Sequence, residues 1–178
     1  MIMSEVDGPD GKGLSGETRH RIAYLRSHRD EISGRLISVT ARCGMMYITK
    51  QLARFNIGAG QAFLLAELFI KDDVSQDVVR CILKMDRGTI TRAMQRLEDL
   101  GYISRRQDTN DRRVVRVSVT EKARKIEEEF FAVLFSWNQG ILKGVSAGEE
   151  SLVVSILRRM SANAEAMARG CEGMGAGE

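Results

Sequence analysis

Residues 86–120 constrain the fold of this chain most strongly, because the hydrophobic period changes once within them. From Ile90 to Leu100 apolar residues recur every three or four positions, as on one face of a helix. From Val115 to Val119 valines alternate with polar residues, which is typical of a half-buried strand. The segment therefore predicts a helix followed by an antiparallel hairpin with strands at residues 102–107 and 114–119.

Residues that begin or end helices divide the rest of the sequence into elements. A Ser, Thr or Asp before an apolar-periodic stretch can accept a hydrogen bond from a free N–H group of the first turn. A Gly after such a stretch can adopt the left-handed conformation that ends a helix. The candidate N-caps are Ser75, Asp86, Thr120 and Ser146, the last forming a capping box with Glu149, and the candidate terminator is Gly101. They predict helices from 75 to about 83, 86 to near 101, 120 to about 143, and 146 onward.

The N-terminal third is also predicted to be helical. Its apolar residues share one stripe of a long helix that runs from Thr18 to about Phe55. The stripe consists of Ile32, Leu36, Val39, Cys43 and Met46. Residues 61–70 are strongly apolar and predict a short buried helix, and the single proline, Pro9, precedes all of these segments. We expect a mainly α-helical chain with one small β hairpin.

Charge is distributed unevenly, although the whole chain carries only +3. Residues 86–125 hold eleven Lys or Arg against six Asp or Glu, whereas residues 126–178 hold four against eight. A basic segment beside an acidic one is expected where only part of a fold contacts phosphate. A solvated charged surface would give the same counts, so charge alone does not decide between the two interpretations.

The outer face of the predicted 86–100 helix carries side chains suited to DNA. Arg and Gln pair well with the edges of guanine and adenine. The residues opposite the apolar face are Gly88, Arg92, Gln95 and Asp99, flanked by Thr91 and Arg96. The hairpin that follows carries Arg112 and Arg113 in its turn. A basic helix followed by such a hairpin is the outline of a winged helix-turn-helix, which reads the major groove with one element and the minor groove with the other.

The order of these elements and their residues resembles the MarR/SlyA family of bacterial transcription regulators over about residues 32–165. A D-x-R turn followed seven residues later by a Thr-Glu-Lys helix start is the most specific part of the pattern. The matching residues are Ser75-Gln76 through Gly101-Tyr102-Ile103, then Arg106, Asp111-Arg112-Arg113 and Thr120-Glu121-Lys122-Ala123. The ordered set carries the resemblance rather than any single residue.

The resemblance implies a mainly α fold with a two- or three-stranded β wing, in which a winged helix-turn-helix is flanked by N- and C-terminal dimerisation helices. The chain then divides into five parts. These are a disordered tail at 1–17, N-terminal dimerisation helices at 18–56, the DNA-binding region at 57–120, C-terminal dimerisation helices at 121–169, and a flexible tail at 170–178.

The partners implied by the resemblance are a second copy of the chain and a pseudo-palindromic DNA operator. Arg113 is expected to enter the minor groove, oriented by Asp111, while Arg112 contacts a phosphate. An alternative is that Asp111 and Arg113 pair only to stiffen the turn. The candidate DNA-binding residues are Ser75, Gln76, Gly88, Thr89, Thr91, Arg92, Gln95, Arg96, Arg106, Asp111, Arg112 and Arg113.

Two residues depart from the family pattern. Arg80 occupies a position where the family usually has a small residue that packs against the recognition helix. A buried arginine there would need a partner or would have to reach outward to solvent. Lys84 stands near the turn where the family has a helix-breaking Gly.

The resemblance further implies a repressor that is released by a small aromatic or amphipathic effector, with no cofactor. Two alternatives stay open. One is a thiol redox sensor that uses Cys43 or Cys81, and the other is a winged-helix module for protein contacts without DNA binding. Catalysis has no support, because neither catalytic motifs nor metal-ligand spacings occur and His20 and His28 lie in a polar stretch. We expect a cytoplasmic protein without a metal site or a membrane segment.

Overall fold

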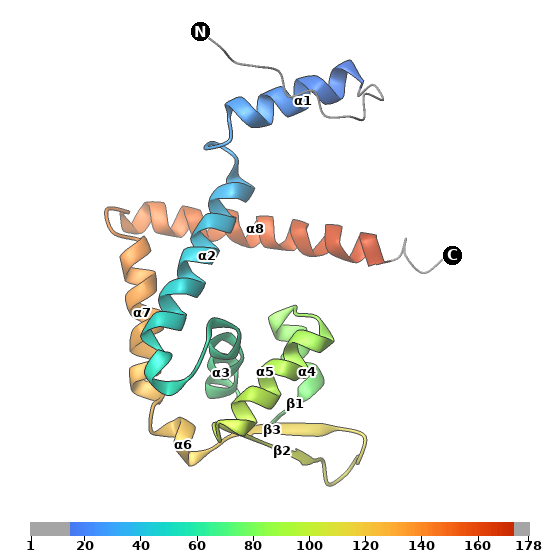
Figure 1. Cartoon of the computed structure of the whole chain (residues 1–178), viewed down its shortest axis with the longest axis vertical. Coiled ribbons are helices and arrows are strands. Elements are labelled where there is room, and N and C mark those ends of the chain that lie inside the picture. The colour runs from blue at the N-terminus through green and yellow to red at the C-terminus, as the bar shows by residue number, and fades with distance from the viewer. Residues whose placement is uncertain (1–14, 173–178) are drawn as a thin grey trace, which may run out of the picture. The chain divides into compact units, whose positions relative to one another are not determined.

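The computed structural model describes residues 15–172 and shows a mainly helical chain with one small sheet (Figure 1). This confirms the predicted fold class. The helices are α1 (Gly16–Ser27), α2 (Ser33–Gln51), the short 3₁₀ helix η1 (Ala53–Phe55), α3 (Ala59–Ile70), α4 (Gln76–Leu83), α5 (Arg87–Asp99), α6 (Glu121–Arg124), α7 (Glu127–Ile141) and α8 (Ala147–Glu172). The strands are β1 (Val74–Ser75), β2 (Ile103–Gln107) and β3 (Val115–Val119).

The predicted tails fall mostly outside the described residues. Where the structure does describe them, α1 already begins at Gly16 and α8 continues to Glu172. The chain divides into two compact units between Ala62 and Phe63. The predicted functional region lies almost entirely in the second unit.

In the first unit, the long helix predicted from Thr18 to Phe55 is interrupted, and this prediction was wrong. A turn at residues 28–32 separates α1 from α2. The Ser27 hydroxyl donates to the Ala23 carbonyl at 2.9 Å, and His28 Nδ1 lies 3.1 Å from the Tyr24 carbonyl oxygen. Such bonds from side chains to backbone satisfy carbonyl groups of the last helical turn and so compete with continuation of the helix.

The core of the second unit gathers α3, α4, α5, the sheet and α7. Phe69 of α3 packs edge-on against Phe130 of α7, with ring centroids 5.3 Å apart. The side chains that are almost fully removed from solvent are Leu64, Leu65, Leu68, Val79, Ile90, Met94, Leu97, Ile103, Val117 and Phe130. Each contributes about 1.5–3 kcal/mol by leaving water. The apolar face predicted for α5 is therefore its buried face.

The sheet has three antiparallel strands in the order β1-β3-β2. The central strand β3 buries Val117 completely, as its alternating pattern predicted. The register places Val117 opposite Val74 of β1, and Arg116 opposite Arg106 of β2. The strand β1 is only two residues long. It pairs with β3 and directly precedes α4, so it connects the hairpin to the start of that helix.

The predicted helix boundaries in the second unit are confirmed by their hydrogen bonds. Ser75, Asp86 and Thr120 each accept from the backbone N–H three residues later, at 3.3, 2.8 and 3.3 Å. Ser146 and Glu149 form the reciprocal capping box. Gly101 has φ +73°, and bonds from Gly101 N and Tyr102 N to the carbonyls of Glu98 and Leu97 close α5.

The helix predicted from Thr120 to about Lys143 is divided, so this prediction was also wrong in part. The i→i+3 bond from Ile126 N to the Ala123 carbonyl tightens the chain after α6, and α7 then starts in a new direction. Arg124 holds this corner because it binds Asp72 and Glu127, both at 2.9 Å.

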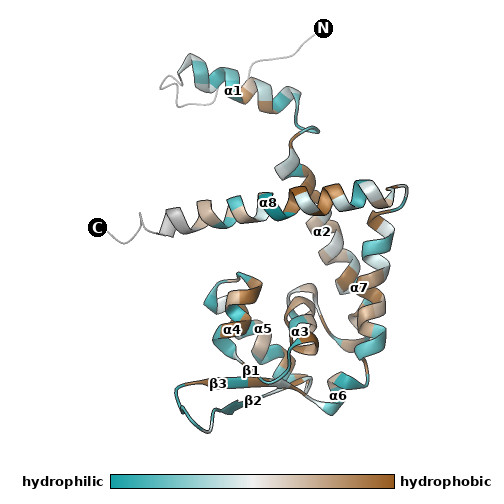
Figure 2. Cartoon of the chain, turned by 180° about the vertical axis from the view of Figure 1, so that it is seen from behind, coloured by the Kyte–Doolittle hydropathy of each residue, from teal (hydrophilic) through white to brown (hydrophobic). Residues whose placement is uncertain are grey.

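The helix α8 keeps much of its apolar surface in water. Leu152 is 59% exposed, and Val153, Val154, Ile156 and Leu157 are exposed as well. Figure 2 shows brown residues along the first half of α8, whereas the loop of the hairpin is teal. Among residues 15–172, no helix is long and apolar enough to cross a bilayer.

Candidate nucleic-acid interface

The helix α5 presents the predicted recognition residues to solvent. Ile90, Ala93, Met94 and Leu97 are buried. The opposite face consists of Gly88, Thr91, Arg92, Gln95 and Arg96, all exposed, with Thr89 half-buried. The helix therefore buries one face in the core and leaves a polar and cationic face open.

Some of the side chains on this open face are already engaged with one another. Arg92 Nη2 donates to Thr89 Oγ1 at 3.3 Å, and Gln95 Nε2 donates to Asp99 Oδ1 at 2.8 Å. Gln95 Oε1 also accepts from Arg105 of β2. Arg96, in contrast, has no ion pair or side-chain hydrogen bond in the described part of the chain. Gln95 would have to give up its bonds to Asp99 and Arg105 before its amide could bind a base, whereas Arg96 has no such bond to break.

The start of α4 carries the next two candidates, Ser75 and Gln76. The Ser75 hydroxyl oxygen accepts from Val78 N, so its role here is to cap the helix. Gln76 is half-buried and lines a small hollow of about 120 Å³ together with Arg80, Arg87 and Arg113. The Asp77 carboxylate, 3.6 Å from Arg80 Nε, lines the same hollow. The structure thus brings α4, α5 and the wing together around three arginines and one carboxylate, a net positive lining that suits a phosphate.

Arg80 does not enter the core. Val79 fills the buried position beside it, while the Arg80 side chain is 45% exposed and lies 3.6 Å from the Asp77 carboxylate. The departure from the family pattern is therefore accommodated by reaching outward. Lys84, the other departure, adopts a left-handed conformation with φ +51° after the end of α4. It takes over the backbone role that a glycine usually fills, at some cost in strain.

At the tip of the wing, Asp111, Arg112 and Arg113 are all exposed. Asp111 Oδ1 accepts a hydrogen bond from the backbone N–H of Arg113 at 2.9 Å. No ion pair joins these two side chains within the described residues, so Asp111 stiffens the turn through the backbone and leaves the Arg113 guanidinium available. The alternative in which the two side chains pair only with each other is not what the structure shows.

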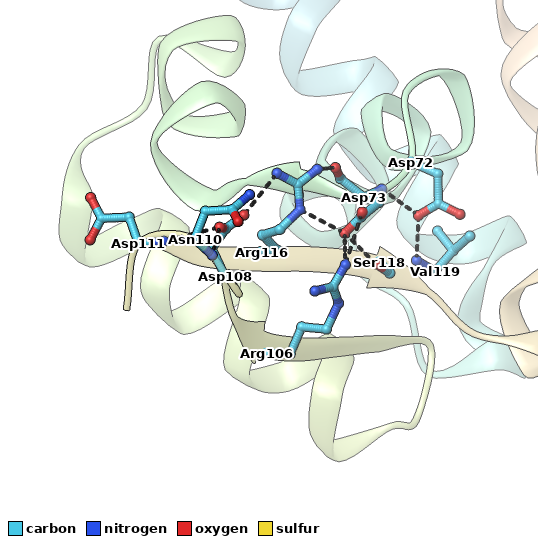
Figure 3. A network of polar contacts seen from close by, with 9 residues as sticks. All are labelled: Asp72, Asp73, Arg106, Asp108, Asn110, Asp111, Arg116, Ser118 and Val119. Carbon is cyan, nitrogen blue, oxygen red and sulfur yellow. Dashed lines mark hydrogen bonds and ion pairs between the residues drawn. The ribbon is translucent and has the colours of Figure 1, made fainter. Parts of the chain in front are cut away.

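At the base of the wing, arginines are bound to carboxylates (Figure 3). Asp73 accepts from Arg106 Nη2 at 3.0 Å and from Arg116 Nε at 3.0 Å. Hydrogen bonding from Arg116, the largest cause, lowers the pKa of Asp73. Arg106, predicted as a DNA contact, is therefore paired while still 52% exposed.

A second pair ties β2 to α5. Arg105 Nε donates to Glu98 Oε2 at 2.9 Å, and this hydrogen bonding lowers the pKa of Glu98. Asp108 similarly accepts from the backbone N–H groups of Asn110 and Asp111, which lowers its pKa.

Asp73, Asp108 and Arg116 were not singled out from the sequence. The signal that could have found them is Arg106 directly opposite Arg116 in the hairpin, because two facing like charges require a carboxylate nearby. The partner, Asp73, is more than thirty residues away in the chain. No local pattern identifies it.

The cysteines and aromatic residues give less evidence of a functional role than the arginines do. Cys43 and Cys81 are both exposed rather than packed as small apolar residues. The Phe131 ring packs against those of Phe69 and Phe130, with ring centroids 5.6 and 5.5 Å apart. This contact favours a core role for Phe131.

Comparisons with known proteins agree with this geometry. The sequence model of the MarR family matches residues 58–115. An uncharacterized HTH-type transcriptional regulator of Bacillus subtilis, YdgJ, is 28% identical over 150 residues, which cover 84% of this chain and 89% of that protein.

Two solved structures are also similar. A MarR transcriptional regulator from Methanosarcina mazei is 31% identical with a TM-score of 0.68, covering 75% of this chain and 90% of that one. A mutant of Escherichia coli MarR, complexed with operator DNA, is 24% identical with a TM-score of 0.66, covering 75% and 96%. The open face of α5, the three-stranded wing and this coverage of whole relatives together establish that the chain belongs to the MarR family of winged helix-turn-helix transcriptional regulators.

Proposed function

We propose that this protein is a homodimeric repressor in which each subunit places α5 in the major groove of one operator half-site and the wing tip in the adjacent minor groove. The observation that carries the proposal is the division of the arginines of the second unit. Those at the base of the wing are paired with carboxylates, whereas Arg96, Arg112 and Arg113 are exposed and have no ionic partner among the described residues. Unpaired guanidinium groups gain most by meeting phosphate or a narrow minor groove.

The hollow between α4, α5 and the wing supplies a phosphate contact in this proposal. Arg80, Arg87 and Arg113 line it, so we add Arg80 and Arg87, which were not among the predicted DNA contacts, to the proposed interface. The likeness of the fold to a MarR mutant that was crystallised with operator DNA supports duplex DNA as the partner in this proposal.

The uncovered apolar surface of α8 supports a homodimer. A row of aliphatic side chains from Leu152 to Leu157 on one helix is more than scattered surface apolar residues. Burial against a second copy would remove it from water and would also set two α5 helices at a fixed spacing. Half-sites read by such a dimer lie about 34–36 Å apart along the duplex.

An open cavity near the start of α5 offers a place for an effector. It measures about 590 Å³ and is lined by Arg80, Lys84 and Arg87 together with Glu165 and Ala168 of α8. Asp86 also lines the cavity, and Lys84 lies 3.4 Å from the Glu165 carboxylate. We propose that a small aromatic anion binds here and releases the DNA, because three cations outnumber two carboxylates in the lining and the cavity adjoins the recognition helix.

Selection of the preferred duplex from a random pool, followed by measurement of affinity between 50 and 200 mM salt, tests the proposal. Counterion release predicts that affinity falls steeply over this range, by about 10³-fold or more for six or more phosphate contacts. Removing one positive charge outside the proposed interface, as in Lys143→Ala, should leave the salt slope as in wild type. If no duplex is bound at low salt, the winged helix serves protein contacts instead.

The dimer and the effector have their own measurements. Analytical ultracentrifugation should give twice the mass of the chain, and Leu152→Glu with Ile156→Glu should give the monomer.

Titration of the DNA complex with aromatic carboxylates should release wild-type protein at lower concentrations than Lys84→Ala. An oxidant that releases DNA from wild type but not from Cys81→Ser or Cys43→Ser would instead support the redox alternative.

A further inference from the structure

The two strands of the wing place arginines directly opposite one another. Arg106 of β2 and Arg116 of β3 are register partners, and like charges in this position destabilise a sheet. The Asp73 carboxylate binds both guanidinium groups and so offsets part of their repulsion. Its Oδ1 lies 3.0 Å from Arg106 Nη2 and 3.0 Å from Arg116 Nε, and its Oδ2 lies 3.0 Å from Arg106 Nη2. A third donor, the Ser118 hydroxyl, reaches Oδ1 at 3.2 Å.

Asp73 also binds Arg116 through its backbone. The Arg116 Nη2 group donates to the Asp73 carbonyl oxygen, so one residue holds the guanidinium with both its side chain and its main chain. Asp73 has φ +49°, in the left-handed region that Asp and Asn tolerate better than other residues with a side chain. The residue type therefore satisfies a conformational and a chemical requirement at once.

A continuous series of hydrogen bonds leads from Asp73 to the wing tip (Figure 3). Arg116 Nη1 lies 3.3 Å from Asp108 Oδ2, and Asp108 Oδ1 accepts from the N–H groups of Asn110 and Asp111 at 2.8 and 3.2 Å. Asp111 in turn accepts from Arg113 N. The backbone that carries Arg112 and Arg113 is thus fixed, step by step, to the turn before β1.

We propose that Asp73 is a positioning residue for DNA recognition, which sets the direction of the wing without touching the duplex itself. This inference rests on the proposed function, because its consequence is measured through the wing's contact with DNA. Without the Asp73 carboxylate, Arg106 and Arg116 repel each other, Asp108 is the remaining carboxylate on Arg116, and the tip samples several directions.

The neighbouring residue Asp72 provides a matched control. It lies in the same turn and is exposed to a similar extent, 37% against 43% for Asp73. Its carboxylate binds Val119 N and Arg124, at the end of β3 and on α6, rather than the arginines of the wing. Its Oδ1 also accepts from Asp73 N at 2.7 Å, a bond that the amide oxygen of an Asn can keep. The same substitution at the two positions therefore separates loss of wing direction from loss of a charge in this turn.

The first experiment compares Asp73→Asn and Asp73→Gly with Asp72→Asn in duplex binding. Both replacements at 73 suit a positive φ, so the fold is retained. We expect Asp73→Gly to weaken binding about tenfold, Asp73→Asn somewhat less, and Asp72→Asn less than about twofold. Equal losses in the two Asn variants would overturn the proposal.

The second experiment combines Asp73→Gly with Arg113→Ala. If Asp73 acts through the wing tip, Asp73→Gly weakens binding about tenfold in wild type and adds almost nothing in the Arg113→Ala protein. Additive losses would show that Asp73 contributes only general stability and would contradict the positioning role.

A third measurement needs no DNA and so separates this inference from the proposed function. Amide hydrogen exchange at residues 108–114 should become faster in Asp73→Gly, while the amides of α5 keep their protection. Unchanged exchange at the tip would overturn the inference even if DNA binding is confirmed. Faster exchange in a protein that bound no duplex would show that Asp73 holds the wing tip and that the proposed function, rather than this contact, had failed.

Discussion

The tip and the base of the wing both carry arginines, but within residues 15–172 these are unpaired at the tip and bound to carboxylates at the base. At the tip, Arg112 and Arg113 are exposed and have no ionic partner in the part of the chain that the structure describes. At the base, Arg106 and Arg116 share the Asp73 carboxylate, and Arg116 also binds Asp108. The four arginines lie within eleven residues of one another in the sequence.

The difference shows that a basic hairpin is not uniformly available to DNA. A paired guanidinium must first give up its carboxylate before it can meet a phosphate, whereas a free one loses only bound water. Surface ion pairs are individually weak, about 0–1 kcal/mol, so the pairs at the base act mainly by fixing geometry. In the proposed function, the tip therefore contacts DNA and the base sets its orientation.

The largest expected effect comes from removing the guanidinium at the tip. Arg113→Ala should weaken operator binding by about 1–3 kcal/mol and relax the preference for A·T pairs beneath the wing. Thermal unfolding should be unchanged, because the Arg113 guanidinium has no ion pair or hydrogen bond with any residue from 15 to 172. Fluorescence anisotropy with duplexes that vary only under the wing measures both effects. Binding as tight as that of wild type would exclude a minor-groove role.

A smaller effect is expected at the base. Arg106→Ala should weaken binding a few-fold with little change in the salt slope, because its guanidinium binds Asp73 rather than a phosphate. The direct phosphate contact that the sequence predicts for Arg106 would instead lower the salt slope by about one. Arg112→Ala is the control at the tip, and we expect it to lower the slope by that amount.

The smallest effect is expected from a change of pH, because the carboxylates at the base of the wing stay charged near neutral pH. The pKa of Asp73 is lowered by hydrogen bonding from Arg116, and that of Asp108 by backbone hydrogen bonds from Asn110 and Asp111. Groups with a lowered pKa stabilise the folded state fully above their ordinary value of 3.8, and this stabilisation is lost as pH falls through the lower folded value. The wing should therefore keep its exchange protection from pH 7 to 5 and lose it only in stronger acid. Loss of protection near pH 6 would contradict a carboxylate-held base.

Much of the fold could be predicted because its signals are local. The caps at Ser75 and Asp86, the terminator at Gly101 and the alternation in β3 each depend on residues within one or two turns. The outer face of α5 follows from the position of its buried face. These features were confirmed because propensity, patterning and burial agree in this region.

Other features could not be read from the sequence. The break between α1 and α2 depends on how Ser27 and His28 compete for backbone carbonyls, and no Gly or Pro marks it. The outward path of Arg80 was one of two open possibilities. The strand β1 is too short to show a period of its own.

The sequence by itself determined the order of the elements, the cationic face of α5 and the arginine-tipped turn, because each depends on the spacing of nearby residues. Only the tertiary structure decided which arginines are free and which are held. Asp73 reaches Arg106 and Arg116 across more than thirty residues of chain, and such a contact exists only once the strands have paired. Whether a guanidinium is available to bind DNA or is held within the fold therefore depends on which residue lies next to it in space. Residue type and local spacing do not give that neighbour.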